Sequence, residues 1–205
     1  MELNSLQYPI GKFAAPEIIT PEIRKNWIKT IDEFPDLLAI VASKLSETTL
    51  KKTYRPGGWT ARQVIHHMFD SHMNCYIRFK KALNEDNPTI MPYSENDWAH
   101  MPDGDDAPIE WSITGVKSVH QRWVYLMNTL QETDWTRTYF HPERGITYPL
   151  DRVLGIYAWH CTHHRRQSSN SYRRYIWCAA TRNCLGTWRW WMALTRAPYD
   201  RVADK

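Results

Sequence analysis

Residues 60–83 read TARQVIHHMFDSHMNCYIRFKKAL, and this stretch decides the fold. Thr60 and Gln63 have the spacing of a capping box, in which each side chain bonds the other residue's main-chain N–H at a helix start. Apolar residues then recur at helical spacing as far as Leu83, at positions 64, 65, 68, 69, 75, 76 and 79. The stretch therefore predicts a long amphipathic helix, which needs other helices to cover its apolar face.

Three more helices are predicted on either side of this one. Thr20-Pro21-Glu22 is a typical helix start, and the helix continues toward Leu45 with Pro35 expected to kink or split it. Apolar spacing predicts a third helix over 109–130, although Gly115 within it costs roughly 1 kcal/mol relative to Ala. The fourth runs from Leu150 to at least His164.

The connections between these helices are of two kinds. Residues 84–108 contain four prolines and many acids, and are expected to form a long loop with a short helix at 95–100. Residues 136–140 and 146–148 flank a turn at Gly145, which is typical of a small hairpin. The predicted fold class is therefore all-α, a four-helix bundle with a small hairpin before the last helix.

Length and composition exclude several classes of protein. The 205 residues suit one globular domain, with 42% hydrophobic and 23% charged residues. No stretch approaches the roughly 20 apolar residues of a membrane span, and the first residues lack a secretory signal. The four cysteines include no C-x-x-C pair. These features predict a cytoplasmic protein with reduced thiols.

The charge is concentrated in the last forty residues. Residues 165–205 hold eight Arg, one Lys and two Asp, a net charge of +7, so residues 1–164 carry −3 of the chain's +4. We expect an arm at 1–19, a bundle domain at 20–170 and a basic, Trp-rich tail at 171–205 outside the core. The acidic body is not expected to bind nucleic acid; the tail could bind nucleic acid or an anionic membrane, although a disordered or misread tail is favoured.

Histidines form two groups on the second and fourth predicted helices. His160 and His164 are four residues apart, on one helix face, in line with an apolar stripe that points into the bundle. Of the adjacent His66 and His67, only one can face the same point, because neighbouring helix positions diverge by about 100°. His67 lies at the edge of the core-facing stripe. Three histidines suit Zn²⁺, and also Ni²⁺ or another divalent transition metal, with a coordination position left open.

Two alternatives remain for these histidines. His160 and His163 are also neighbours on a helix, at a spacing of three, and could serve in place of His160 and His164. All of them could instead be hydrogen-bonded residues of the core or its rim, with no metal. Asp70, one turn beyond His67, could orient a ligand imidazole or hold a water molecule, although a solvated helix position is the commoner role. Arg55 and Arg78 could bind an anionic substrate.

Several longer motifs occur in order along the chain. They are Tyr8-Pro9-Ile10-Gly11, residues 54–60 (YRPGGWT), 62–68 (RQVIHHM), 70–74 (DSHMN), 76–80 (YIRFK), and Trp159-His160 with His163-His164. Together they resemble the YfiT group of the DinB-like superfamily, over roughly residues 7–164. The resemblance implies a bacterial metal-dependent hydrolase, a cytoplasmic homodimer, and one divalent ion per subunit, usually zinc. The family's ligand histidines fall on His67, His160 and His164.

The resemblance also implies an alternative activity and one departure. Related members of the superfamily transfer groups to thiols such as bacillithiol, so the small-molecule substrate could include a low-molecular-weight thiol. The departure begins at Arg165, where the family continues with small and apolar residues and a further histidine. A genuine extension and a shifted reading frame both explain the sequence that follows.

Overall fold

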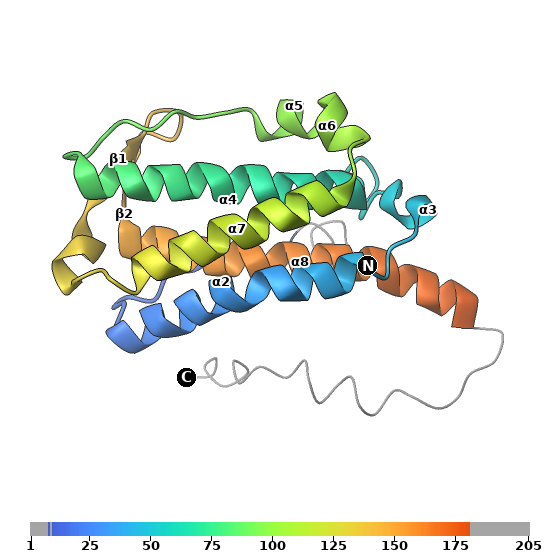
Figure 1. Ribbon diagram of the computed structural model, residues 1–205, viewed down its shortest axis with the longest axis horizontal. Coiled ribbons are helices and arrows are strands. Elements are labelled where there is room, and N and C mark those ends of the chain that lie inside the picture. The colour runs from blue at the N-terminus through green and yellow to red at the C-terminus, as the bar shows by residue number, and fades with distance from the viewer. Residues whose placement is uncertain (1–7, 9, 181–205) are drawn as a thin grey trace. The chain divides into compact units, whose positions relative to one another are not determined.

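A computed structural model describes residues 8 and 10–180, with side chains described as far as Arg166. The chain divides into two compact units, Met1–Tyr172 and Arg173–Lys205, and the three-histidine cluster and the hairpin belong to the first. Its long helices are α2 (Pro21–Ala42), α4 (Ala61–Asn84), α7 (Ile109–Met127) and α8 (Leu150–Ala180). Figure 1 shows them side by side, with the hairpin at one end of α4 and the short helix α3 (Glu47–Leu50) at the other. The four-helix bundle is confirmed.

Helix α4 begins as its sequence predicts. The Thr60 hydroxyl accepts a hydrogen bond from the Gln63 main-chain N–H, and the Gln63 side chain accepts one from the Thr60 N–H. The helix is central to the bundle and presents buried residues on most of its circumference, fourteen of its 24 positions. It therefore has one face for α7 and another for α8.

Gly115 on α7 is required by the close approach of α4. A Cβ at this position would lie 2.5 Å from Cε2 of Phe69, far inside normal contact. The residue that weakens α7 as an isolated helix thus allows the two helices to pack closely. The core beneath them contains fully buried Phe79, Val116 and Trp123.

Helix α2 differs from its expected form. Pro35 lies inside it and does not split it, and the helix ends at Ala42, followed by α3. The Thr20 cap and Pro21 at the first turn are as predicted. Arm residues pack on the bundle: Gly11 O accepts a hydrogen bond from Trp159 Nε1 at 3.1 Å.

Short elements complete the connections. The loop after α4 contains two helices, α5 (Glu95–Ala99) and α6 (Pro102–Asp105), of which only the first was expected. A 3₁₀ helix, η1 (Glu132–Thr136), precedes the antiparallel strands β1 (Thr138–His141) and β2 (Ile146–Pro149), which pair Tyr139 with Tyr148. The hairpin is confirmed, and it lies at the end of the bundle where α8 starts.

Helix α8 continues beyond the expected change in character at Arg165. Its backbone is helical to Ala180, well past His164, the minimum extent predicted from the sequence. The polar residues after His164 offer no apolar stripe, but none of them up to Ala180 is a proline or glycine that would break the helix. The domain limits at 170 and 171 remain predictions. Within the described part of the chain, no helix is long and apolar enough to cross a membrane.

Candidate metal centre

Three histidines from two helices of the bundle come together. His67 projects from α4, and His160 and His164 project from successive turns of α8. The Nε2 atom of His160 lies 3.4 Å from Nε2 of His67 and 3.1 Å from Nε2 of His164. One turn away, Ser71 Oγ lies 3.3 Å from the Tyr157 hydroxyl and ties the same two helices together. One ring nitrogen from each of the three histidines therefore lies within 4.8 Å of the other two.

The spacing of these nitrogens fits a metal ion. With Zn–N bonds of 2.0–2.1 Å and tetrahedral angles, two ligand nitrogens lie about 3.3 Å apart. The two measured Nε2–Nε2 separations, 3.4 and 3.1 Å, bracket that value. His67 is also left with a buried Nδ1 that has no hydrogen-bond partner. A set of three imidazoles suits Zn²⁺, Ni²⁺ or a similar divalent transition ion.

Burial keeps the imidazoles in the protonation state that binds metal. Desolvation, with His163 nearby, lowers the pKa of His67 to about 4. Desolvation and the neighbouring histidines hold the pKa of His160 well below its usual value. Both rings are therefore neutral at pH 7, with a lone pair available for a cation.

The cluster opens onto a cleft of about 640 Å³ between α4, α8 and the hairpin. Trp59 forms one wall, with its ring centroid 4.7 Å from that of His67. Trp159, which directly precedes His160 on α8, also lines the cleft. Both indoles are half-buried and line the cleft, so neither is a fully buried core residue. At the hairpin end the lining is polar and includes Arg78, Tyr93, His141, Arg144 and Glu143.

The neighbouring histidines point elsewhere. His66 Nδ1 lies 2.7 Å from Ser112 Oγ and its Nε2 lies 3.1 Å from Ala107 O, so its ring is directed to the α7 side. His163 stacks on Trp159 with ring centroids 4.5 Å apart. Within the described residues, neither histidine belongs to the three-histidine cluster. The structure thus brings His67, His160 and His164 together, as the helical-face argument predicts.

Comparisons with known proteins agree with this geometry. The model of the DinB superfamily matches residues 30–168. The chain belongs to the DinB superfamily. Proteins from Bacillus cereus strain 03BB102 and Bacillus mycoides strain KBAB4, each named a "putative metal-dependent hydrolase", are 45% identical over 175 residues, which is 85% of this chain and all of theirs.

A solved structure of the superfamily has the same fold. YfiT from Bacillus subtilis, described as "a probable metal-dependent hydrolase with an unusual four-helix bundle topology", is 38% identical to this chain. The match has a TM-score of 0.82 and covers 83% of this chain and 98% of YfiT.

Asp70 and Arg55, which were considered as site residues from the sequence, lie outside the three-histidine cluster. Asp70 is half-buried near Asp103, and burial and that neighbouring acid raise its pKa to about 6. Among the described residues Asp70 neither lines the cleft nor bonds to the three histidines. Nothing in this geometry supports a role for Asp70 in orienting a ligand imidazole. Arg55 bonds the Tyr54 hydroxyl and does not line the cleft, whereas Arg78 does.

The sequence did not indicate two buried histidines, His72 and His120, that connect to the three-histidine cluster through His160. His72 Nε2 lies 3.0 Å from His160 Nδ1, and His72 Nδ1 lies 2.8 Å from His120 Nε2. His72 is five residues from His67, a spacing that turns it away from that ring on the helix, and His120 lies alone on α7. Only their positions within apolar stripes could have indicated that they are buried.

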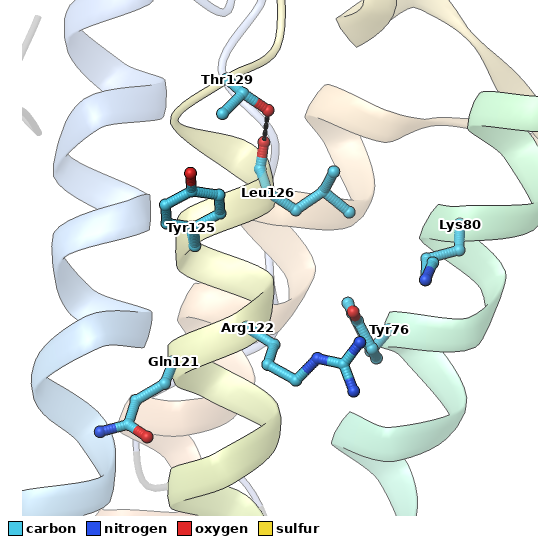
Figure 2. Close-up of a pocket in the computed structure, with 7 residues that line it drawn as sticks. All are labelled: Tyr76, Lys80, Gln121, Arg122, Tyr125, Leu126 and Thr129. Carbon is cyan, nitrogen blue, oxygen red and sulfur yellow. Dashed lines mark hydrogen bonds between the residues drawn. The ribbon is translucent and has the colours of Figure 1, made fainter.

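A second hollow in this DinB protein carries no metal ligands. It measures about 400 Å³ and lies between the surfaces of α4 and α7. Figure 2 shows Arg122 reaching from α7 toward Tyr76 on α4, and the guanidinium carbon lies 5.9 Å from the tyrosine ring centroid. Its lining contains no His, Cys, Asp or Glu. The histidine cleft is therefore the better candidate for the functional site.

Proposed function

We propose that the protein is a metal-dependent hydrolase in which His67, His160 and His164 hold one divalent ion, with Zn²⁺ as the first candidate. The observation that carries the proposal is the convergence of three Nε2 atoms at the spacing of metal ligands. The names of the curated relatives support it. A divalent ion held by these neutral imidazoles would supply Lewis acidity, which strongly lowers the pKa of a bound water, toward about 7.

The chain's own residues define the rest of the site. The indoles of Trp59 and Trp159 supply apolar walls that exclude water from the reacting groups. The linked hydroxyls of Ser71 and Tyr157 face the same cleft one turn from the cluster and can bind a polar part of a substrate. Three protein ligands leave room for the substrate beside the ion.

Arg78 favours a small-molecule substrate with a negatively charged end. Its side chain lines the cleft and is only 9% exposed, and its buried Nε has no hydrogen-bond partner. One Nη2 contact, 3.3 Å to Met91 O, and no ion pair with a carboxylate are found for it within the described residues. A buried cation without a counter-charge is costly, so a carboxylate or phosphate of the substrate would offset it. Arg78 is eleven positions after His67 on α4, which places the two residues about 16 Å apart along the helix axis.

The first experiment measures metal and then activity. Full-length protein is analysed for bound metal, and hydrolysis of p-nitrophenyl esters is compared for acyl chains that end in a carboxylate and in a methyl group. We expect about one ion per chain, and a preference for the carboxylate esters that Arg78→Met removes. No bound metal under metal-replete conditions would overturn the proposal.

The thiol-transfer alternative is tested in the same screen. Each reaction is run with and without a low-molecular-weight thiol such as bacillithiol. The open coordination position could equally take a thiol and hold it as a thiolate. Turnover that requires the thiol and forms a thioether would replace hydrolysis by S-transfer, while the same three ligands remain.

We also propose a homodimer, which the YfiT-group resemblance supports. Trp111 and Tyr125 on α7 are 69% and 75% exposed, and a subunit interface on this helix would cover both. Light scattering after size-exclusion chromatography should give twice the chain mass of 24.4 kDa. The cytoplasmic location remains a prediction. Binding of nucleic acid or membrane by the tail also remains a prediction, because residues 181–205 lie outside the described part.

A further inference from the structure

A line of three histidines runs from the candidate metal centre through the bundle to main chain on the far side. His160 on α8 contacts His72 on α4, which contacts His120 on α7, and His120 Nδ1 lies 2.6 Å from the carbonyl oxygen of Ile31 on α2. His72 and His120 are 0% and 1% exposed. Each of the four long helices contributes one residue to this line.

The hydrogen bonds in this line can point in only one direction when the rings are neutral. The Ile31 carbonyl can only accept, so His120 carries its proton on Nδ1 and presents a lone pair at Nε2. His72 must then donate from Nδ1 to His120, which leaves a lone pair on His72 Nε2. His160 must in turn donate from Nδ1 to His72. The Nε2 atom of His160 is therefore unprotonated, and it is the atom that faces His67 and His164.

We propose that this line fixes His160 as its Nδ1–H tautomer and so presents Nε2 as a metal ligand, with His72 and His120 as positioning residues. The role in metal binding rests on the proposed function. In water, a neutral imidazole prefers the opposite tautomer, with the proton on Nε2, which cannot ligate through that atom. A protein acceptor for the other ring proton is the usual support of a metal-binding histidine. Here that acceptor is a second histidine, anchored through a third.

The surroundings favour neutral rings in this line. Both rings are fully enclosed by protein, and desolvation by burial lowers the pKa of His120 to about 4. Phe34 covers both rings: it is stacked on His72, with centroids 5.9 Å apart, and tilted against His120, with centroids 5.7 Å apart. An unpaired ring nitrogen there would be costly, so a single arrangement of protons is strongly selected.

A second metal site at the same residues is the competing interpretation. His72, His120 and Cys161 have potential ligand atoms within 4.8 Å of one another. Both nitrogens of each histidine already have partners, and the 2.8 Å gap between the two rings is shorter than the roughly 3.3 Å between ligands of one tetrahedral ion. Burial also raises the pKa of the Cys161 thiol well above its usual value, which disfavours the thiolate that metals bind.

The direct test is nuclear magnetic resonance on full-length, metal-free protein with ¹⁵N-labelled histidine. Long-range ¹H–¹⁵N correlations distinguish the two tautomers of each ring. We expect the Nδ1–H form for His160, His72 and His120. An Nε2–H form of any of the three would overturn the proposal, whether or not the protein later binds metal. Failure of the proposed function is seen separately, as absence of metal binding.

Variants at position 72 test the consequence for affinity. His72→Leu removes the acceptor, whereas His72→Gln offers Oε1 to the His160 Nδ1–H. We expect Zn²⁺ affinity, measured by chelator competition, to fall about 10–100-fold in His72→Leu and to recover most of that loss in His72→Gln. Equal affinities in wild type and His72→Leu would contradict the proposal. A stoichiometry of two ions in wild type that falls to one in His72→Leu would establish the second metal site instead.

His120 and His66 provide the remote variant and the matched control. His120→Leu leaves His72 without its acceptor, so the direction of the line is lost and Zn²⁺ affinity should fall although His120 lies two rings from the ion. His66→Leu removes another buried histidine, 6% exposed, whose two ring nitrogens both have partners outside the line, and should leave affinity unchanged. An equal loss in both would show a general packing effect and overturn the proposal. If the leucine variants do not fold, the wild-type tautomers alone decide.

Discussion

The histidines on the two faces of α4 differ in the partners of their ring nitrogens. On the α8 side, the Nε2 of His67 faces other ring nitrogens and its Nδ1 has no partner. On the α7 side, His66 has a hydroxyl and a carbonyl as partners for its two nitrogens. The two residues are adjacent and equally buried. The difference lies in what Nε2 faces: for His67 it is a ring nitrogen at the spacing of metal ligands, and for His66 it is a carbonyl oxygen.

The largest expected effect is the loss of metal from one member of this adjacent pair. His67→Ala should remove most of the bound ion, because the two histidines left on α8 make a poor site. His66→Ala should keep it, although the variant loses two buried hydrogen bonds and some stability. Metal content per folded chain, measured by atomic emission, compares the two. Wild-type stoichiometry in His67→Ala would show that His67 is not a ligand.

The same comparison can be made on α8. His164→Ala should lose the ion and His163→Ala should keep it, because His163 is stacked on Trp159 and lies outside the cluster. Metal content again decides. The reverse result would mean that the ligand face of α8 is rotated by about one residue.

A third prediction uses the shared burial of histidines on both faces. The pKa of His67 and that of His120 are lowered from 6.5 to about 4 in the folded state, so between these values the unfolded chain binds more protons. The free energy of unfolding of the metal-free protein should therefore decrease as pH falls from 6.5 toward 4, and be constant above about 7.5 as far as these groups are concerned. Urea unfolding at several pH values measures it. A stability that rises with acidification would contradict neutral buried rings.

The sequence predicted the elements more completely than the contacts between them. The capping box at Thr60, the hairpin around Gly145 and the four long helices follow from local patterns that need no knowledge of the partners. The close contact of Gly115 with Phe69 does not, because a glycine in a helix only signals a cost until the neighbouring helix is placed. The same limit explains the candidate site. Helical spacing selected one face for His160 and His164, but His72 and His120 matter through rings contributed by other helices.

A fourth prediction concerns packing away from the histidines. Gly115→Ala improves the helical propensity of α7 by roughly 1 kcal/mol, but it forces a methyl group against the Phe69 ring. Overpacking of this kind costs about 1–3 kcal/mol, so the variant should be destabilised or nearly neutral and never clearly stabilised. Urea unfolding measures the change, with metal content as the control that should not move. A gain of 1 kcal/mol would show that α4 and α7 are less closely packed than described.

The smallest effect is expected at the C-terminal end. Deletion of residues 171–205 removes the last ten residues of α8 and everything after them, while the three histidines and the core residues among the side chains described, up to Arg166, lie at or before position 164. The truncated chain should unfold cooperatively and bind the same amount of metal, with a stability change within about 1 kcal/mol. A second chain that ends at Ala180 separates the contribution of the helix end from that of the following residues. Loss of the cooperative transition in both would show that the tail is part of the folded domain. Loss in the shorter chain alone would move the domain boundary to the end of α8, because the residues between 171 and 180 would then be needed to hold the turn that carries His164.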